Sequence, residues 1–177
     1  MDTILIFTDA ATSSIMNIAV GAFLCIDEKL MQQYAKCSME DLYIELVDRI
    51  VYQQYPSKKS TWSEIKIVID ALHFVRNNFE SIQKIEIYTD CQSLCDLLGK
   101  RKEKIQKNHF ITRAGKTLQN ANLYKELFEN AEKFQIQTLK IKGHCSIAYR
   151  LTAQEKIFAV LDKFSRKKLR ALLTSDR

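Results

Sequence analysis

The sequence predicts an α/β fold in which helices flank a mixed five-stranded sheet. Three strand-like runs come first, and helical and strand-like segments alternate after them, a pattern typical of sheets that combine hairpins with crossover connections. One Pro and four Gly in 177 residues give no sign of a disordered segment or a linker. We therefore expect a single domain over residues 1–177, large enough to bury about two thirds of its unfolded surface.

The N-terminal third predicts three strands and one short helix. Residues 4–9 form an apolar run, and residues 18–26 form a second run after a tight connection. Residues 48–55 are rich in β-forming side chains and stop at Pro56, so we expect the third strand there. Between them, residues 39–47 carry apolar side chains at helical spacing and predict a short inserted helix.

Helices and strands alternate over the rest of the chain. A helical period of apolar residues predicts a helix over 62–79, with serines of the preceding loop 57–60 as caps and Glu64 in the first turn. The remaining expected elements are a strand at 84–90, helices at 92–98 and 123–134, a strand at 136–141, a loop at 143–151 and a helix at 152–173.

Four acidic residues are candidate metal ligands. Asp9 and Asp90 each end a strand-like run, and parallel neighbouring strands would bring the two carboxylates side by side. Like charges at that range repel, so such a pair is typical of a divalent-cation site, to which Glu64 and Asp162 could contribute. Each acid also has a structural alternative: the two strand-terminal Asp as turn formers, Glu64 at a helix dipole and Asp162 paired with Arg166.

Basic residues form two clusters in a chain with a net charge of +6 and a pI near 9.0. The first includes Lys100, Arg101, Lys102, Lys104 and Lys107, and the second includes Lys163, Arg166, Lys167, Lys168 and Arg170. Either cluster alone could be a solvated surface. Two clusters beside acids that repel nucleic acid indicate phosphate binding.

Composition also bears on membranes, location and cysteine chemistry. No apolar run approaches the roughly 20 residues that span a bilayer, and the N-terminus lacks the basic start of a signal peptide. We therefore expect a soluble, cytoplasmic monomer without a membrane partner.

The five cysteines cannot all pair, and we expect them to be reduced. A zinc site formed by Cys91, Cys95, His144 and Cys145 is a weak alternative, because their spacing fits no structural zinc pattern.

Five short islands, in this order, resemble the type 1 ribonuclease H family. They are Thr8-Asp9; Tyr55 with Glu64 nine residues later and Ala71-Leu72 beyond it; Tyr88-Thr89-Asp90-Cys91-Gln92; Lys142-Gly143-His144; and Asp162-Lys163-Phe164-Ser165-Arg166. The resemblance covers nearly the whole chain. It implies a ribonuclease H-like fold and an endoribonuclease that cleaves the RNA strand of RNA/DNA hybrids and leaves 5′-phosphate ends.

The resemblance also implies roles for individual residues. Two Mg²⁺ ions, with Mn²⁺ as an alternative, would be held by Asp9, Glu64, Asp90 and Asp162, and His144 would move protons or help to release product. Among the substrate contacts, Gln92, Ser60 and Thr61 would face the grooves of the hybrid, while Lys100, Arg101, Lys102 and Lys104 would grip its DNA strand.

Three departures from the family pattern leave alternatives open. Ala10 replaces the Gly after the first Asp, and Ser60-Thr61 replaces an Asn pair, so a nuclease acting on DNA or junctions stays a rival. The stretch from His144 to Asp162 is longer than usual, which makes Glu155 a rival fourth ligand, although the neighbours of Asp162 favour that residue. A hybrid-binding module without catalysis is a further rival, against which the four acids and His144 speak.

Overall fold

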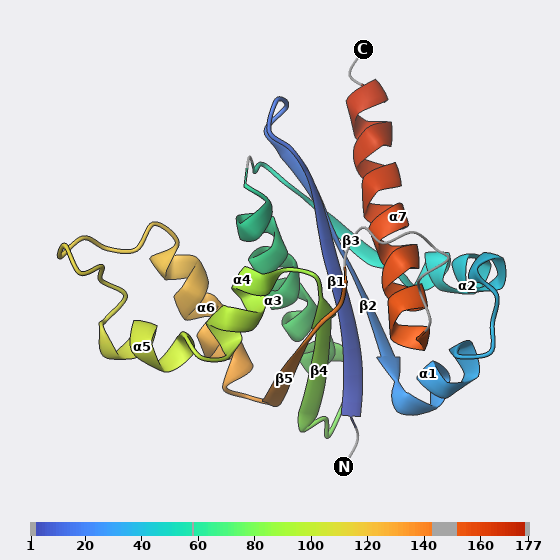
Figure 1. Ribbon diagram of the computed structural model, residues 1–177, viewed down its shortest axis with the longest axis horizontal. Coiled ribbons are helices and arrows are strands. Elements are labelled where there is room, and N and C mark those ends of the chain that lie inside the picture. Colours follow the sequence, from blue (N-terminus) through green and yellow to red (C-terminus); the bar gives the residue numbers. More distant parts are fainter. Residues whose placement is uncertain (1–2, 58, 143–151, 176–177) are drawn as a thin grey trace.

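The computed structural model describes residues 3–57, 59–142 and 152–175, and its strands form one five-stranded mixed sheet (Figure 1). The strands are β1 (Thr3–Ser13), β2 (Ile18–Asp27), β3 (Val51–Tyr55), β4 (Lys84–Thr89) and β5 (Gln135–Lys140), in the spatial order β3-β2-β1-β4-β5. The pairs β1–β2 and β2–β3 are antiparallel, whereas β1–β4 and β4–β5 are parallel. The predicted fold class is therefore confirmed.

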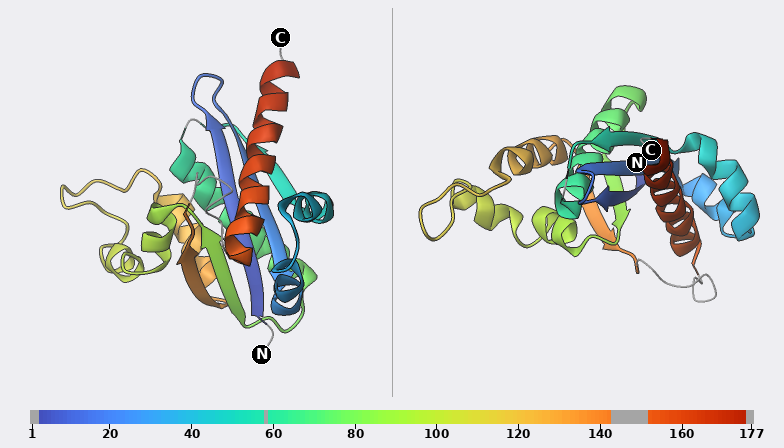
Figure 2. Two further views of the ribbon diagram at one scale, coloured as in Figure 1. Left: turned by 45° about the vertical axis from the view of Figure 1, so that its right-hand side comes forward. Right: turned by 90° about the horizontal axis from the view of Figure 1, so that it is seen from above.

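Helices cover both faces of this sheet (Figure 2). They are α1 (Glu28–Tyr34), α2 (Met39–Leu46), the 3₁₀ turn η1 (Val47–Arg49), α3 (Ser60–Asn78), α4 (Gln92–Leu98), α5 (Lys102–Lys107), α6 (Ala121–Ala131) and α7 (Ala153–Ser175). Within the described ranges, no helix combines the length and the apolarity that crossing a membrane requires.

The alternation of side chains along β1 builds two hydrophobic cores. Ile4 and Ile6 point into the core that contains α3 and α6, whereas Leu5 and Phe7 point into the core that contains α2 and α7. Because both faces are covered, all four side chains are buried and the strand reads as a continuous apolar run. The sheet thus positions α3 on one side of β1 and α7 on the other.

Gly21 in β2 allows α3 to lie very close to the sheet. A Cβ atom at this position would lie 2.8 Å from Cε2 of Tyr55 and 2.9 Å from Cβ of Ile67, so a larger residue would push the helix away. Gly21 pairs with Ala10 across the β1–β2 ladder. The close approach therefore holds α3 against the part of β1 that carries Asp9 and Ala10.

Several boundaries differ from those that the sequence predicts. β1 continues to Ser13 because residues beyond Asp9 pair with β2, so Asp9 lies within its strand and not at its end. The third strand begins at Val51 because the residues before it form η1. Helix α3 begins at Ser60, with Lys59 as an N-cap without a side-chain hydrogen bond, so the expected serine cap is wrong and Glu64 falls in the second turn.

Two short helices have no counterpart in the sequence prediction. Helix α1 starts where the side chain of Asp27 accepts a hydrogen bond from the backbone N–H of Leu30 at 2.7 Å. Helix α5 buries Ile105 alone, and one apolar residue sets no period that a sequence pattern could reveal. The expected loop at 143–151 lies outside the described residues.

Candidate active site

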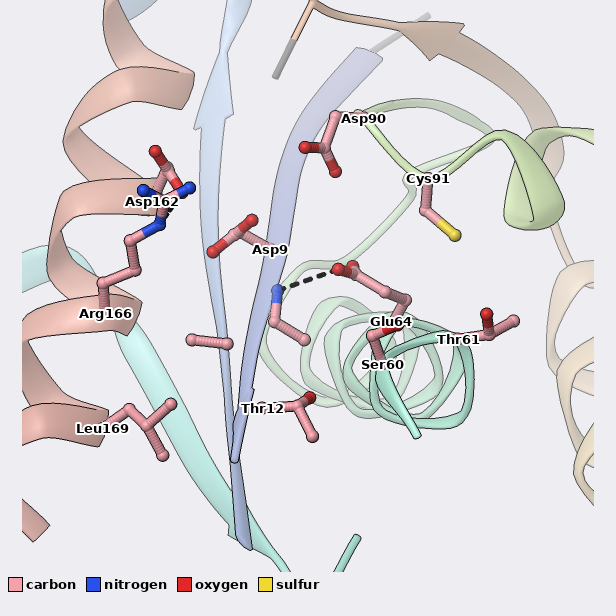
Figure 3. A pocket seen from close by; sticks show the side chains of 12 residues that line it. Asp9, Thr12, Ser60, Thr61, Glu64, Asp90, Cys91, Asp162, Arg166 and Leu169 are labelled. Atoms are coloured by element: carbon pink, nitrogen blue, oxygen red, sulfur yellow. Dashed lines mark hydrogen bonds and ion pairs between the residues drawn. The ribbon is translucent and has the colours of Figure 1, made fainter. Parts of the chain in front are cut away.

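Three carboxylates meet at the carboxyl end of the parallel strand pair β1–β4 (Figure 3). Phe7 pairs with Tyr88, and Asp9 and Asp90 each lie two residues further along their chains. Glu64 reaches the same point from α3, and one oxygen from each of the three carboxylates lies within 4.8 Å of the others. The expected side-by-side placement of Asp9 and Asp90 follows from the strand register, and α3 adds the third acid.

Burial raises the pKa values of two of these acids. Asp9 and Glu64 are 5% and 7% exposed. Burial, with the nearby charges of Asp162 and Asp90, raises the pKa of Asp9 to about 7, although a hydrogen bond from Ser165 opposes the shift. Burial raises the pKa of Glu64 well above its usual range, and the charges of Asp9 and Asp90 add to this effect. A bound cation would reverse both shifts, because it stabilises the ionised carboxylates.

Glu64 has one carboxylate oxygen with a hydrogen bond and one without, and this pattern suits a cation site. Oε1 accepts a hydrogen bond from the backbone N–H of Ala10 at 3.2 Å, but Oε2 is buried without a hydrogen-bond partner among the described residues. A buried oxygen without a hydrogen bond destabilises the folded state. Three carboxylates that offer hard oxygen ligands, one of them otherwise unpaired, therefore fit a divalent cation such as Mg²⁺.

Helix α7 closes the other side of the site with three residues from one turn. Asp162 lines the pocket, and its Oδ1 lies 2.8 Å from Nε of Arg166, which lines the same pocket. Between them in sequence, Ser165 donates a hydrogen bond from its hydroxyl to Oδ2 of Asp9. Asp162 thus faces the carboxylates, but it lies outside the group of three whose oxygens are within 4.8 Å of one another.

The rival acid Glu155 occupies a different position on α7. Its Oε2 accepts a hydrogen bond from the backbone N–H of Thr152 at 3.0 Å, and its own N–H donates to Oγ1 of Thr152 at 3.2 Å. This reciprocal pair is a capping box at the start of the helix. Glu155 does not line the pocket, so the geometry favours Asp162 as the fourth acid.

The pocket has a volume of about 450 Å³. Its lining consists of Asp9, Ala10, Ala11, Thr12, Ser60, Thr61, Glu64, Asp90, Cys91, Asp162, Arg166 and Leu169. The expected substrate contacts Ser60 and Thr61 are therefore beside the acids. Thr12 and Leu169 also line the pocket but have no role in the sequence prediction. Thr12 reaches the pocket because β1 extends to Ser13. Ser165 belongs to the last of the five sequence islands, but no sequence signal indicates its contact with Asp9.

The other expected substrate contacts lie outside this pocket. Gln92 is exposed at the start of α4, and its Nε2 donates to Oδ1 of Asp96 at 3.0 Å. Lys100 pairs with Asp96 at 3.2 Å, and Lys102 lies 3.6 Å from Glu132. Arg101 and Lys104 are exposed on the same stretch, where α5 and the segment after it extend away from the sheet (Figures 1 and 2).

The expected histidine role and the zinc alternative involve His144 and Cys145, which lie outside the described residues. Cys91 and Cys95, the other two members of that alternative, are free thiols that are partly buried. Burial raises the pKa of Cys91 to about 11, which keeps its thiol protonated at neutral pH.

Comparison with known proteins gives a consistent set of similarities. The RNase H family model matches residues 1–155. A ribonuclease H from Thermoanaerobacter sp. (strain X514) is 29% identical over 87 residues, which are 49% of this chain and 54% of that protein. A ribonuclease H from Thermoanaerobacter pseudethanolicus matches to the same extent. The alignment thus spans about half the length of these curated relatives.

Solved structures share the fold at low sequence identity. The structure of LC9-RNase H1, described as a type 1 RNase H with the type 2 active-site motif, has a TM-score of 0.63 at 11% identity over 94% of this chain and 70% of that chain. The PFV RNase H domain has a TM-score of 0.60 at 14% identity over 94% and 92% of the two chains. A foamy viral protease-reverse transcriptase in complex with RNA/DNA hybrid has a TM-score of 0.58 at 12% identity over 94% and 19%.

Proposed function

The chain belongs to the RNase H family, and on this premise we propose that it is a metal-dependent endonuclease that hydrolyses the RNA strand of RNA/DNA hybrids. The observation that carries the proposal is the cluster of Asp9, Glu64 and Asp90, in which two acids are buried and one buried oxygen has no hydrogen-bond partner among the described residues. Without a cation, such a cluster of buried carboxylates lowers the stability of the folded protein. With a divalent cation bound, it can hold a phosphodiester.

The positions of the acids support the proposed roles, because Asp9 lies beside both Glu64 and Asp90. Asp9 and Asp90 would be the central ligands, and Asp9 would serve both metal positions. Glu64 would hold one ion and Asp162, which lines the same pocket, would hold the other. When bound, two Mg²⁺ ions supply an activated water and neutralise charge on the scissile phosphate. Mn²⁺ offers the same chemistry to the same oxygen ligands. His144 is assigned to proton movement or product release.

The proposed substrate contacts divide between the pocket and the surface beside it. Ser60 and Thr61 line the pocket next to Glu64, and a hydroxyl offers both a donor and an acceptor to the 2′-hydroxyl that distinguishes RNA from DNA. Gln92 offers an amide at the start of α4. The residues Lys100, Arg101, Lys102 and Lys104 would contact phosphates of the DNA strand.

We also propose a cytoplasmic location. Cys25, Cys37, Cys91 and Cys95 are free thiols, which suit a reducing compartment. We expect a monomer, which light scattering of the purified protein measures directly.

Cleavage of matched duplexes tests this proposal. RNA/DNA, DNA/DNA and RNA/RNA duplexes of one sequence, each labelled on either strand, would be incubated with the protein in Mg²⁺ and in EDTA. We expect Mg²⁺-dependent cleavage of the RNA strand in the hybrid alone, with 5′-phosphate ends on the products. Cleavage of the DNA duplex would favour the rival DNA nuclease, and tight hybrid binding without cleavage would favour a module that has no catalytic activity.

A further inference from the structure

Ser165 is a buried polar residue that sequence reasoning gave no role. It lies on α7, its side chain is 0% exposed, and its hydroxyl contacts Oδ2 of Asp9 across the boundary between α7 and β1. The same Oγ lies 3.1 Å from the carbonyl oxygen of Asp162, one turn earlier in the helix. A buried helical serine commonly donates to that carbonyl and makes no other bond. Here the hydroxyl also reaches a carboxylate of the proposed site.

The Ser165 hydroxyl has a single hydrogen, and this limits it to one good hydrogen bond as a donor. A serine hydroxyl has one hydrogen, while a carbonyl oxygen and an ionised carboxylate oxygen are both acceptors. A hydrogen bond to an ionised acceptor is stronger than one to a neutral acceptor. Ser165 therefore donates to Asp9 when that carboxylate is charged, and the carbonyl of Asp162 is the secondary acceptor.

We propose that Ser165 is a positioning residue for the metal site, because its hydroxyl fixes the orientation of the Asp9 carboxylate. The bond engages Oδ2 of Asp9 from the α7 side, while the same carboxylate lies beside Glu64 and Asp90 (Figure 3). This inference rests on the proposed function in one respect, namely that Asp9 is a metal ligand. Ser165 itself does not line the pocket, so we assign it no contact with substrate or metal.

The placement of Ser165 between Asp162 and Arg166 supports this role. Asp162 and Arg166 pair with each other and line the pocket, so this turn of α7 faces the site. Phe164, on the same turn, is buried in the core and anchors the helix there. The hydroxyl is thus presented from a rigid element, and a fixed donor lowers the entropy that the Asp9 side chain loses when it binds a cation.

The chain offers a matched control for the loss of one buried serine hydroxyl. Ser63 is also 0% exposed on a helix, and its hydroxyl donates to the carbonyl oxygen of Lys59 at 3.2 Å. It precedes Glu64 in sequence but does not line the pocket. A change to alanine at either position removes the same atom, so a difference between the two variants reports the contact with Asp9.

The test measures Mn²⁺ binding to metal-free protein without nucleic acid. Isothermal titration calorimetry would compare the wild type with Ser165→Ala, Ser165→Cys and Ser63→Ala, and melting curves in EDTA would verify that each variant is folded. We expect about tenfold weaker Mn²⁺ binding in Ser165→Ala, as the loss of a hydrogen bond to a charged group predicts, and an intermediate loss in Ser165→Cys because a thiol is a weaker donor. Ser63→Ala should bind Mn²⁺ as the wild type does.

Kinetics separate positioning from a general structural effect. Under single-turnover conditions with hybrid, Ser165→Ala should need more Mn²⁺ for half-maximal rate but approach the wild-type rate at saturating metal. Unchanged or tighter Mn²⁺ binding in folded Ser165→Ala, or in folded Ser165→Cys if the alanine variant does not fold, would overturn the inference. If the wild type binds Mn²⁺ but cleaves no hybrid, the proposed function fails while the calorimetric comparison still decides the role of Ser165. A wild type that binds no Mn²⁺ overturns both.

Discussion

Asp9 and Glu64 are buried beside other carboxylates, so the stability of the metal-free protein should depend on pH. The pKa of Asp9 is about 7 in the folded protein against 3.8 for the isolated group. The folded state therefore binds the proton more tightly than the unfolded state, so the contribution of Asp9 to stability falls as pH rises from about 4 to about 7. The raised pKa of Glu64 acts in the same direction.

Melting curves of metal-free protein check this sign. Asparagine cannot lose a proton, so Asp9→Asn should melt at a higher temperature than the wild type in EDTA, and the difference should grow from pH 5 to pH 7. Mn²⁺ should stabilise the wild type more than the variant, because it binds the ionised carboxylates. A wild-type advantage that grows with pH in EDTA would show that burial does not control this carboxylate.

Removing one charge from the cluster should abolish cleavage but spare binding. Asp9→Asn and Asp90→Asn each remove a carboxylate from the group of three, which weakens metal binding and also lowers the repulsion of phosphate. We expect hybrid affinity within a few fold of wild type by fluorescence anisotropy and almost no Mg²⁺-dependent cleavage. The proposed metal roles are wrong if either variant retains a tenth of the wild-type cleavage rate.

Helix α7 carries both candidates for the fourth acid. Asp162 faces the pocket, whereas Glu155 forms the capping box with Thr152 at the start of the helix. Asp162→Asn should therefore lower turnover at least tenfold, with partial recovery in Mn²⁺. Glu155→Gln should stay near wild type in turnover, and also in stability, since Gln serves in a capping box. Parallel assays that gave the reverse ranking would move the site to Glu155.

The basic stretch around α5 should govern affinity and not chemistry. Lys102 lies beside Glu132 and over the ring of Phe128, so it has a packing role, and the informative substitutions are Lys100, Arg101 and Lys104 to Gln. Fewer phosphate contacts release fewer counterions, so hybrid affinity should fall and depend less steeply on salt. The single-turnover rate at saturating protein should change little. An unchanged salt slope would identify the stretch as ordinary solvated surface.

The elements that sequence analysis located correctly are those with a buried face. β1, β2, α3 and α7 bury several apolar side chains each, and this burial produces the period that a pattern detects. Helices α1 and α5 are short and depend on a local cap or on one buried residue, so their patterns carry little signal. Residues 10–13 are small or polar and do not continue the larger apolar side chains of residues 4–7, so the sequence does not predict this end of β1, and their pairing with β2 makes them a strand.

Across the whole molecule, some parts of the candidate site follow from local sequence patterns, and others depend on how distant elements pack. Asp9 and Asp90 end or follow apolar runs, so their meeting follows from parallel pairing of two predicted strands. Ser165 and Asp9 are 156 positions apart, and their contact depends on how α7 packs on β1. Nothing local to Ser165 encodes that packing. The acids were therefore predictable from the sequence, but the hydrogen bond that orients one of them was not.

We propose that Asp9, Glu64 and Asp90 hold divalent ions against the RNA strand of a hybrid. An anomalous difference map at the manganese edge tests this, from metal-free crystals of the wild type with an RNA/DNA hybrid that are soaked briefly with Mn²⁺ and then frozen, because a short soak limits cleavage. We expect manganese within coordination distance of all three carboxylates and of one phosphate of the RNA strand. Manganese absent from these carboxylates, or coordinated to a phosphate of the DNA strand, would contradict the claim.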